Sequence, residues 1–568
     1  MGGLRWLGRA LGGALLVALM LLALAPAAAS VLDRGPRGEV RASPLPLALV
    51  LFDPATWQAA RNSSAVAAVV ALGSMVLGVG LGLLASGRRS WGRGGLVALG
   101  IAPLALGPIV VAPGLVMVLG GVDGWDWLAA RSILGASCED LARWVMLGWL
   151  GLGSGVPLVI LATTGAVARL EPGWADAARA VGASRWRTWR EVTWPILRPD
   201  VARAAASAFA ASLLEPAGPS ILGLRRTLAV QVLEGAHRLD QPTRPAALAL
   251  LASGIAALAW LALRRWGGMA VDRALPEPGP SPPSVGRGPG LASALLLMAW
   301  AAAALGPGLL ALGRSLQSAR SEDAGGWSGL ILGLCIDPEV RGWARNAAGS
   351  AALALAVDLL ILAAIAGRGS KGVLRRLVVP FEVVPPLALA VGALATPWLI
   401  AALADHSGPK VDPWLRAIAA ELSPSKGPGW LLALALAAAG LPMLARAADL
   451  AGARARPALA DAARALGLKP RRARRAGDPR WLGIVPGRAA VLAFALASTG
   501  LAPALLLAPT PETRTLAAAA FGLVRDSGPG AIDPHAAGPL AILAALRLVG
   551  LVAASTGRSI PLGRWFRG

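Results

Sequence analysis

The chain has 568 residues, of which 56% are hydrophobic, and its formal net charge is +23. This much apolar surface exceeds what one soluble core can bury, so the composition indicates an integral membrane protein. The basic residues lie mainly between apolar runs rather than in one patch, as at Arg88, Arg89, Arg264 and Arg265. That distribution is typical of cytoplasmic loops and argues against a nucleic-acid-binding protein.

The first thirty residues allow two interpretations. Arg5 and Arg9, an apolar stretch and the alanines at 27–29 describe either a cleavable signal peptide or a first span. We favour a retained helix, because an even number of crossings then leaves both Arg-rich ends of the chain in the cytoplasm.

Apolar runs of about 20 residues, the length needed to cross a bilayer, recur along the whole chain. The first set of expected spans lies near 11–30, 64–86, 95–121, 143–168, 200–223 and 245–263. The second lies near 291–313, 347–367, 378–404, 429–450, 484–507 and 538–557. The sequence therefore predicts an all-α membrane protein with about twelve transmembrane helices in two homologous sets of six.

A proline-rich segment separates the two sets. It predicts a first transmembrane domain at 1–266, a linker at 267–290 and a second transmembrane domain at 291–568. Within the third and ninth spans, prolines interrupt the backbone hydrogen bonding, at Pro103, Pro108, Pro113, Pro380, Pro385 and Pro386. Such breaks are found either where helices line a pathway or in helices kinked for packing.

Three acidic residues fall inside predicted spans: Glu215, Asp358 and Glu382. A charge in the bilayer is costly, so these are candidates for a transport pathway. Glu215 has an alternative interpretation at a helix end, paired with an arginine.

A repeated pattern occurs in the loop that follows the fourth span of each set. Trp174, Ala177, Ala178 and Val181 form an apolar stripe at helical spacing, and Leu459, Ala462, Ala463 and Leu466 reproduce it. Asp176 and Gly182 recur as Asp461 and Gly467, in both cases 285 positions later (461 − 176 = 467 − 182). The glycine predicts a left-handed turn that ends a short helix, and Ser184 can cap the next one. The constant offset predicts an internal duplication.

The stretch from Asp176 to Pro195 resembles the "EAA" loop of ABC importer permeases, with Asp176 for Glu, Val192 for Ile and Trp194 for Leu. The resemblance implies a type I, MetI-like fold and a coupling helix that contacts a separate cytoplasmic ATPase, a homodimer. It also implies a periplasmic solute-binding protein as partner and a multi-pass protein of the bacterial inner membrane. The even number of predicted spans places both termini in the cytoplasm. The second loop departs from the pattern, because Gly477 replaces Ile and Pro479 comes one residue early.

Fused permeases of this kind resemble iron(III) importers and their relatives for thiamine and phosphonates. The stretch Leu501 to Pro509, followed by Glu512 and Thr513, is similar to the iron(III) permeases, although Gly500 replaces their acidic residue. The resemblance implies ferric iron as the solute, and another small solute is the alternative.

No enzymatic site is predicted. The four lysines, Lys371, Lys410, Lys426 and Lys469, are never preceded by glycine, which excludes a GxxxxGK[ST] phosphate-binding loop. The three histidines (His237, His406, His535) and two cysteines (Cys138, Cys335) show no metal-ligand spacing, and we expect no cofactor. The two cysteines either pair in the periplasm or stay free thiols. The rival class is a gradient-driven secondary transporter, which would not need the repeated docking loop.

Overall fold

The structure is a computed structural model. It describes residues 2–34, 40–86, 92–119, 132–133, 136–167, 170, 177–236, 242–268, 291–321, 337–366, 378–407, 411–423, 429–453, 464–467, 484–527 and 534–555. The proline-rich linker beyond residue 268 lies outside the described residues, as do His237 and Cys335.

The described chain is almost entirely helical, with two short antiparallel hairpins. The elements before the linker are α1 (Gly2–Ser30), β1 (Leu32–Arg34), β2 (Val40–Ala42), α2 (Leu45–Phe52), α3 (Pro54–Ser86), α4 (Gly92–Ile101), η1 (Ala102–Ala105), α5 (Pro108–Leu119), β3 (Ser132–Ile133), β4 (Ala136–Ser137), α7 (Cys138–Val167), α9 (Arg185–Thr188), η2 (Trp189–Thr193), α10 (Trp194–Leu213), α11 (Ala217–Ile221), α12 (Leu228–Ala236) and α13 (Thr243–Gly267). Strand β1 pairs with β2, and β3 with β4.

The elements after the linker are again helical. They are α14 (Leu291–Ser321), α16 (Pro338–Ala366), α18 (Val379–Val383), α19 (Pro386–Asp405), α20 (Asp412–Glu421), α21 (Gly429–Ala453), α24 (Ile484–Ser498), α25 (Leu501–Leu507), α26 (Leu516–Asp526), η5 (Pro534–Ala536) and α27 (Ala537–Ser555).

All twelve predicted spans coincide with helical structure. Among the described residues, 7 helices are long and apolar enough to cross a membrane, and up to 9 if each bent pair counts as one span. Two shorter apolar helices, Gly429–Ala445 and Ala537–Ala553, and the more polar α10 correspond to the remaining predictions. The prediction of an all-α membrane protein is confirmed.

Several helices begin before the predicted span. Helix α3 starts at Pro54 and α16 at Pro338, because an aspartate before each proline accepts a hydrogen bond from the backbone of the first turn. Asp53 Oδ1 accepts from Ala55 N (2.9 Å), and Asp337 Oδ1 accepts from Glu339 N (2.8 Å). Hydropathy marks only the part of a helix in hydrocarbon, so it misses these polar first turns.

A second contact is also found in both halves. Asn62 Nδ2, in α3, donates to Arg226 O (3.1 Å), which precedes α12. Asn346 Nδ2, in α16, donates to Arg514 O (3.1 Å), which precedes α26. The order of elements and this long-range contact therefore recur after the linker.

The first helix of each half packs on the other half. Helix α1 contacts α16 and α19, and α14 contacts α4 and α5. The packing is close: a Cβ on Gly392 of α19 would collide with the carbonyl oxygen of Leu22 in α1, and Trp300 of α14 donates from Nε1 to Gly100 O (3.1 Å). As a result, the largest apolar core joins residues of both halves.

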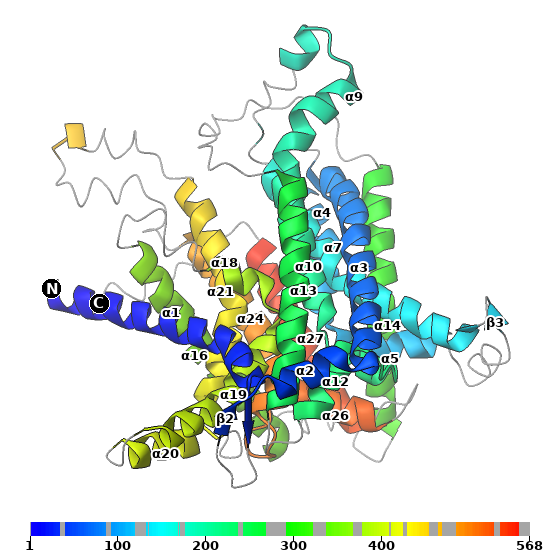
Figure 1. Ribbon diagram of the computed structural model, residues 1–568. Helices are drawn as coiled ribbons and strands as arrows, with labels where there is room; N and C mark the ends of the chain where they lie inside the picture. Colours follow the sequence, from blue (N-terminus) through cyan, green and yellow to red (C-terminus); the bar gives the residue numbers. More distant parts are fainter. Residues whose placement is uncertain are drawn as a thin grey trace.

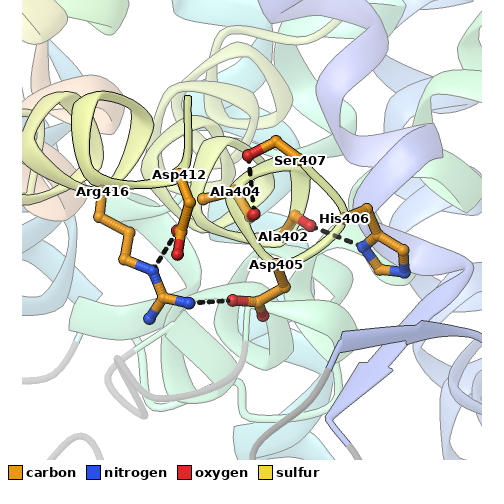
Figure 2. A network of polar contacts seen from close by, with 7 residues as sticks. All are labelled: Ala402, Ala404, Asp405, His406, Ser407, Asp412 and Arg416. Atoms are coloured by element: carbon orange, nitrogen blue, oxygen red, sulfur yellow. Dashed lines mark hydrogen bonds and ion pairs between the residues drawn. The ribbon is translucent and has the colours of Figure 1, made fainter. Parts of the chain in front are cut away.

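The bundle has two distinct ends. In Figure 1, α9 projects at the top, whereas β2, α12, α20 and α26 lie at the bottom. At the lower end, α19 is tied to α20 by Arg416, whose Nη2 donates to Asp405 Oδ1 (2.9 Å) and whose Nε donates to Asp412 (Figure 2). The hydrogen bond to Asp412 raises the pKa of Arg416 above its ordinary value. Which end faces the cytoplasm remains a prediction from charge.

Candidate functional site

The loop before α9 forms the turn that the sequence predicts. Residues 177–180 are helical, and Gly182 follows with φ 84°. Ala183 N donates to Ala178 O (3.0 Å) and Gly182 N donates to Arg179 O (3.0 Å), which together make a Schellman motif. Ser184 then caps α9 by accepting from Arg187 N (3.2 Å). The left-handed turn at Gly182 is confirmed.

The turn exposes its apolar residues. Val181 is 85% exposed, Ala177 is exposed and Ala178 is half-buried, so the described part of the stripe has little cover within the chain. Trp174 and Asp176 lie outside the described residues. An uncovered apolar turn at one end of a membrane bundle is suited to contact with another protein.

A π-helical turn joins α9 to α10, whose second residue is the exposed Pro195. Proline lacks the N–H of a regular helix and its ring clashes with the carbonyl four residues earlier, so the wider turn over Trp189–Thr193 accommodates it. The chain therefore continues from the exposed turn into α10 without a loop.

Aromatic contacts connect the segment from α9 to α10 with the last turn of α13. Trp194 lies 5.9 Å from Trp189 and 5.8 Å from Trp266, between ring centroids. The Arg198 guanidinium lies 4.8 Å from the centroid of Trp266. From the sequence, Trp194 was identified only as the residue that replaces leucine in the loop motif. Only the fold places it against Trp266, 72 positions later (266 − 194).

The second loop is described over residues 464–467. Gly467 has φ 78° and its N donates to Arg464 O (3.0 Å), the counterpart of the bond at Gly182. Leu466 is 83% exposed, as Val181 is in the first loop. Leu459, Asp461, Ala462 and Ala463 lie outside the described residues.

The three predicted pathway carboxylates do not form one site. Glu215 connects α10 to α11, where Oε1 accepts from Ala217 N (2.9 Å) and Oε2 accepts from Gly218 N (2.7 Å). Asp358 of α16 is buried, and its Oδ1 has no hydrogen-bond partner. Glu382 is half-buried in α18, just before the break at Pro385 and Pro386. No cluster of three or more His, Cys, Asp or Glu side chains that could hold a metal occurs in the described part of the chain.

Cys138, the first residue of α7, is half-buried and forms no disulfide with another described residue. Its possible partner Cys335 is not among the described residues.

Sequence reasoning missed Arg547, a half-buried residue near the middle of α27. Its Nε donates to Thr499 Oγ1 (2.8 Å) and its Nη2 to Thr499 O (3.3 Å), and it attracts Glu215 electrostatically. A charge inside a span is costly, and this argument identified the three carboxylates as candidates. It applies equally to Arg547, which lies inside the last predicted span, so the residue could have been identified from the sequence.

Comparison with known proteins finds a matching family over part of the chain. Residues 78–268 match the family "Binding-protein-dependent transport system inner membrane component", a family of transport permeases. The match begins within α3, ends just after α13 and includes the turn at Gly182. The matched residues all lie in the first half of the chain.

Among individual relatives, the chain is similar to the "Molybdenum transport system permease protein ModB" of Escherichia coli (strain K12). The two are 29% identical over 172 residues, which cover 29% of this chain and 71% of the relative. ModB of Escherichia coli O157:H7 matches with the same identity and coverage.

Proposed function

We propose that this chain is the transmembrane permease subunit of a bacterial ABC importer, with two permease domains, 1–266 and 291–568, in one polypeptide. The observation that carries the proposal is the exposed Gly182 turn inside the region that matches the permease family. The equivalent turn at Gly467 and the recurring Asn62 and Asn346 contacts support the duplication.

The two turns are the ATPase contacts in this proposal. Each presents an exposed apolar residue, Val181 or Leu466, before a glycine with positive φ. A partner that binds these side chains displaces the first turn. The displacement is transmitted to α10 through the π-helical turn, and to α13 through the contact between Trp194 and Trp266. Closure of the ATPase subunits then moves the helices and alternates access between the two sides.

The second turn is flanked by Lys469, Arg471 and Arg472, where the first loop has a mixed sequence. We therefore expect the two turns to bind the ATPase unequally, with the first turn, which lies in the region that matches the permease family, contributing more of the binding.

Two similarities to known permeases favour an inorganic ion as the solute. Ferric iron follows from the resemblance of the stretch around α25 to iron(III) permeases, and molybdenum follows from the ModB relatives. Both fit an importer that receives a small solute from a periplasmic binding protein.

The proposal is tested by replacing the exposed apolar residues with aspartate. The tagged chain is purified from membranes of its source bacterium, and a co-purifying subunit is identified by mass spectrometry and by ATP hydrolysis. Val181→Asp should lower the amount of bound ATPase by about tenfold, the effect of losing about 1.4 kcal/mol of apolar contact. Leu466→Asp should lower it less.

Val411→Asp is the matched control. Val411 is also an exposed valine, but it precedes α20 at the opposite end of the bundle. Retention of the ATPase by Val181→Asp, or equal loss in Val411→Asp, would contradict the assignment of the docking turn.

A further inference from the structure

The described part of the chain contains two small cavities that share one charged residue. One, of about 30 Å³, is lined by segments of the first half together with Ala304 and Arg547. The other, of about 10 Å³, lies between Gly107 and Val110 of the first half and Thr499 and Leu543 of the second. Among the described residues, Arg547 is the only charged side chain that lines either cavity.

Both cavities lie at breaks in the helices. Gly107 separates η1 from α5, and the segments on either side of this break are bent by 84°. Thr499 lies between α24 and α25, which are bent by 44°. Non-helical backbone at membrane depth is found where it is buried in protein or lines a solute path. Arg547 therefore reaches the breaks of both halves at once.

The local sequence makes room for the guanidinium. A Cβ on Gly107 would collide with Nη1 of Arg547, so any larger residue at 107 would displace the arginine. Thr499 holds the opposite side through the two hydrogen bonds from Nε and Nη2. The guanidinium is thus fixed in orientation between Gly107 and Thr499.

The charge of Arg547 is only partly compensated. Both carboxylate oxygens of Glu215 accept from backbone N–H groups of α11, and the attraction between Glu215 and Arg547 acts without a direct ion pair. An arginine has five N–H donors, and Thr499 uses only those on one side. The remaining donors make no hydrogen bond to another described residue, and Arg547 lines both cavities, whose other lining residues are mainly apolar.

We infer that Arg547 is the recognition group for an oxyanionic solute, which it binds between the two halves during translocation. The inference rests on the proposed importer function and specifies its substrate class. A planar guanidinium matches the oxygens of an oxyanion through paired hydrogen bonds, whereas it repels a bare cation such as ferric iron.

The cavities are too small to hold the solute in this conformation. A single water needs about 10–15 Å³ by this measure, so neither cavity admits a tetrahedral oxyanion in this conformation. The solute reaches Arg547 only after the halves separate at Gly107 and Thr499. In the closed state, Arg547 bridges the two breaks and blocks the path.

The test compares uptake of labelled oxyanions and of ferric iron by cells that contain the importer with its own ATPase and binding protein. Molybdate, tungstate and sulfate are the anionic probes, and ⁵⁵Fe(III) is the cationic one. Arg547→Gln should lower oxyanion uptake by about tenfold or more, as expected when charge-assisted hydrogen bonds to the solute are lost. Arg525→Gln, an exposed arginine of α26 away from both cavities, removes the same charge and should have no effect.

Arg547→Lys separates a defect in solute recognition from a defect in folding. It keeps the positive charge among the helices but replaces the planar guanidinium by an ammonium group, which cannot form the paired hydrogen bonds. Its KM for the oxyanion should rise at an unchanged membrane level. Normal oxyanion uptake by Arg547→Gln, or an unchanged KM in Arg547→Lys, overturns the inference. So does uptake of iron but of no oxyanion by the unmodified chain. In these cases the ATPase still co-purifies and uptake still needs ATP, whereas failure of the proposed function removes both.

Discussion

Replacing Gly182 by valine should weaken coupling to the ATPase without disturbing insertion into the membrane. Gly182 has φ 84°, a conformation that β-branched residues rarely adopt. A Cβ at this position would meet no heavy atom of the described residues within 4 Å, so we expect no steric clash there. The whole cost therefore comes from the backbone.

That cost is roughly 1–2 kcal/mol for a residue forced into the left-handed region. It lowers the population of the native turn by a factor of about 5–30 relative to alternative conformations. ATP-dependent uptake should fall by a similar factor, because only the native turn presents Val181 to the partner. Asparagine tolerates the left-handed region better, so Gly182→Asn should retain most of the uptake.

The assay measures uptake, the amount of chain in the membrane and the thermal stability of each purified variant. Gly165→Val, inside α7, is the matched control, since it adds the same atoms in open space without a positive φ. Equal uptake by Gly182→Val and Gly182→Asn would refute the argument, because the two differ mainly in their tolerance of this backbone conformation.

Three further predictions concern stability, measured by thermal or denaturant unfolding in detergent. Asn346→Ala removes donors to two carbonyls (2.7 and 3.1 Å) and should cost about 1–3 kcal/mol, more than Asn62→Ala with one bond; equal losses would contradict this. Gly392→Leu should cost about 1–3 kcal/mol by forcing α1 away from α19, whereas Gly349→Leu, which has open space, should be neutral; a neutral Gly392→Leu would exclude the close packing. Asp358→Leu should stabilise by about 1–3 kcal/mol, since it removes a buried carboxyl oxygen without a partner, and destabilisation would show that the carboxyl has a partner in the membrane.

Much of the local structure could be predicted from neighbouring residues alone. Every span predicted from hydropathy falls on helical structure, and 7 to 9 spans among the described residues are long and apolar enough to cross a membrane, because a membrane helix must be apolar over a fixed length. The turn at Gly182 and the cap at Ser184 also followed from sequence, since both depend on hydrogen bonds within a few residues. The starts of α3 and α16 were placed too late, because their first turns are polar.

The site was only partly predictable. Glu215, Asp358 and Glu382 were correctly placed within or beside helical spans, yet they belong to three separate places in the fold. Arg547 carried the same signal of a charge in a span and was overlooked. Its importance became evident only from Gly107 and Thr499, which lie far from it in the sequence.

The sequence by itself determined the class of fold, the positions of the helices, the glycine turn of each loop and the similarity to transport permeases. It could do so because hydropathy, turn chemistry and motif spacing are local properties of the chain. Only the tertiary structure decided that α1 and α14 pack on the opposite halves, that Trp194 meets Trp266, and that Arg547 reaches both helix breaks. These contacts depend on how apolar faces pack in three dimensions, and inside a membrane close packing of small residues such as Gly392, rather than hydropathy, selects the partner helix.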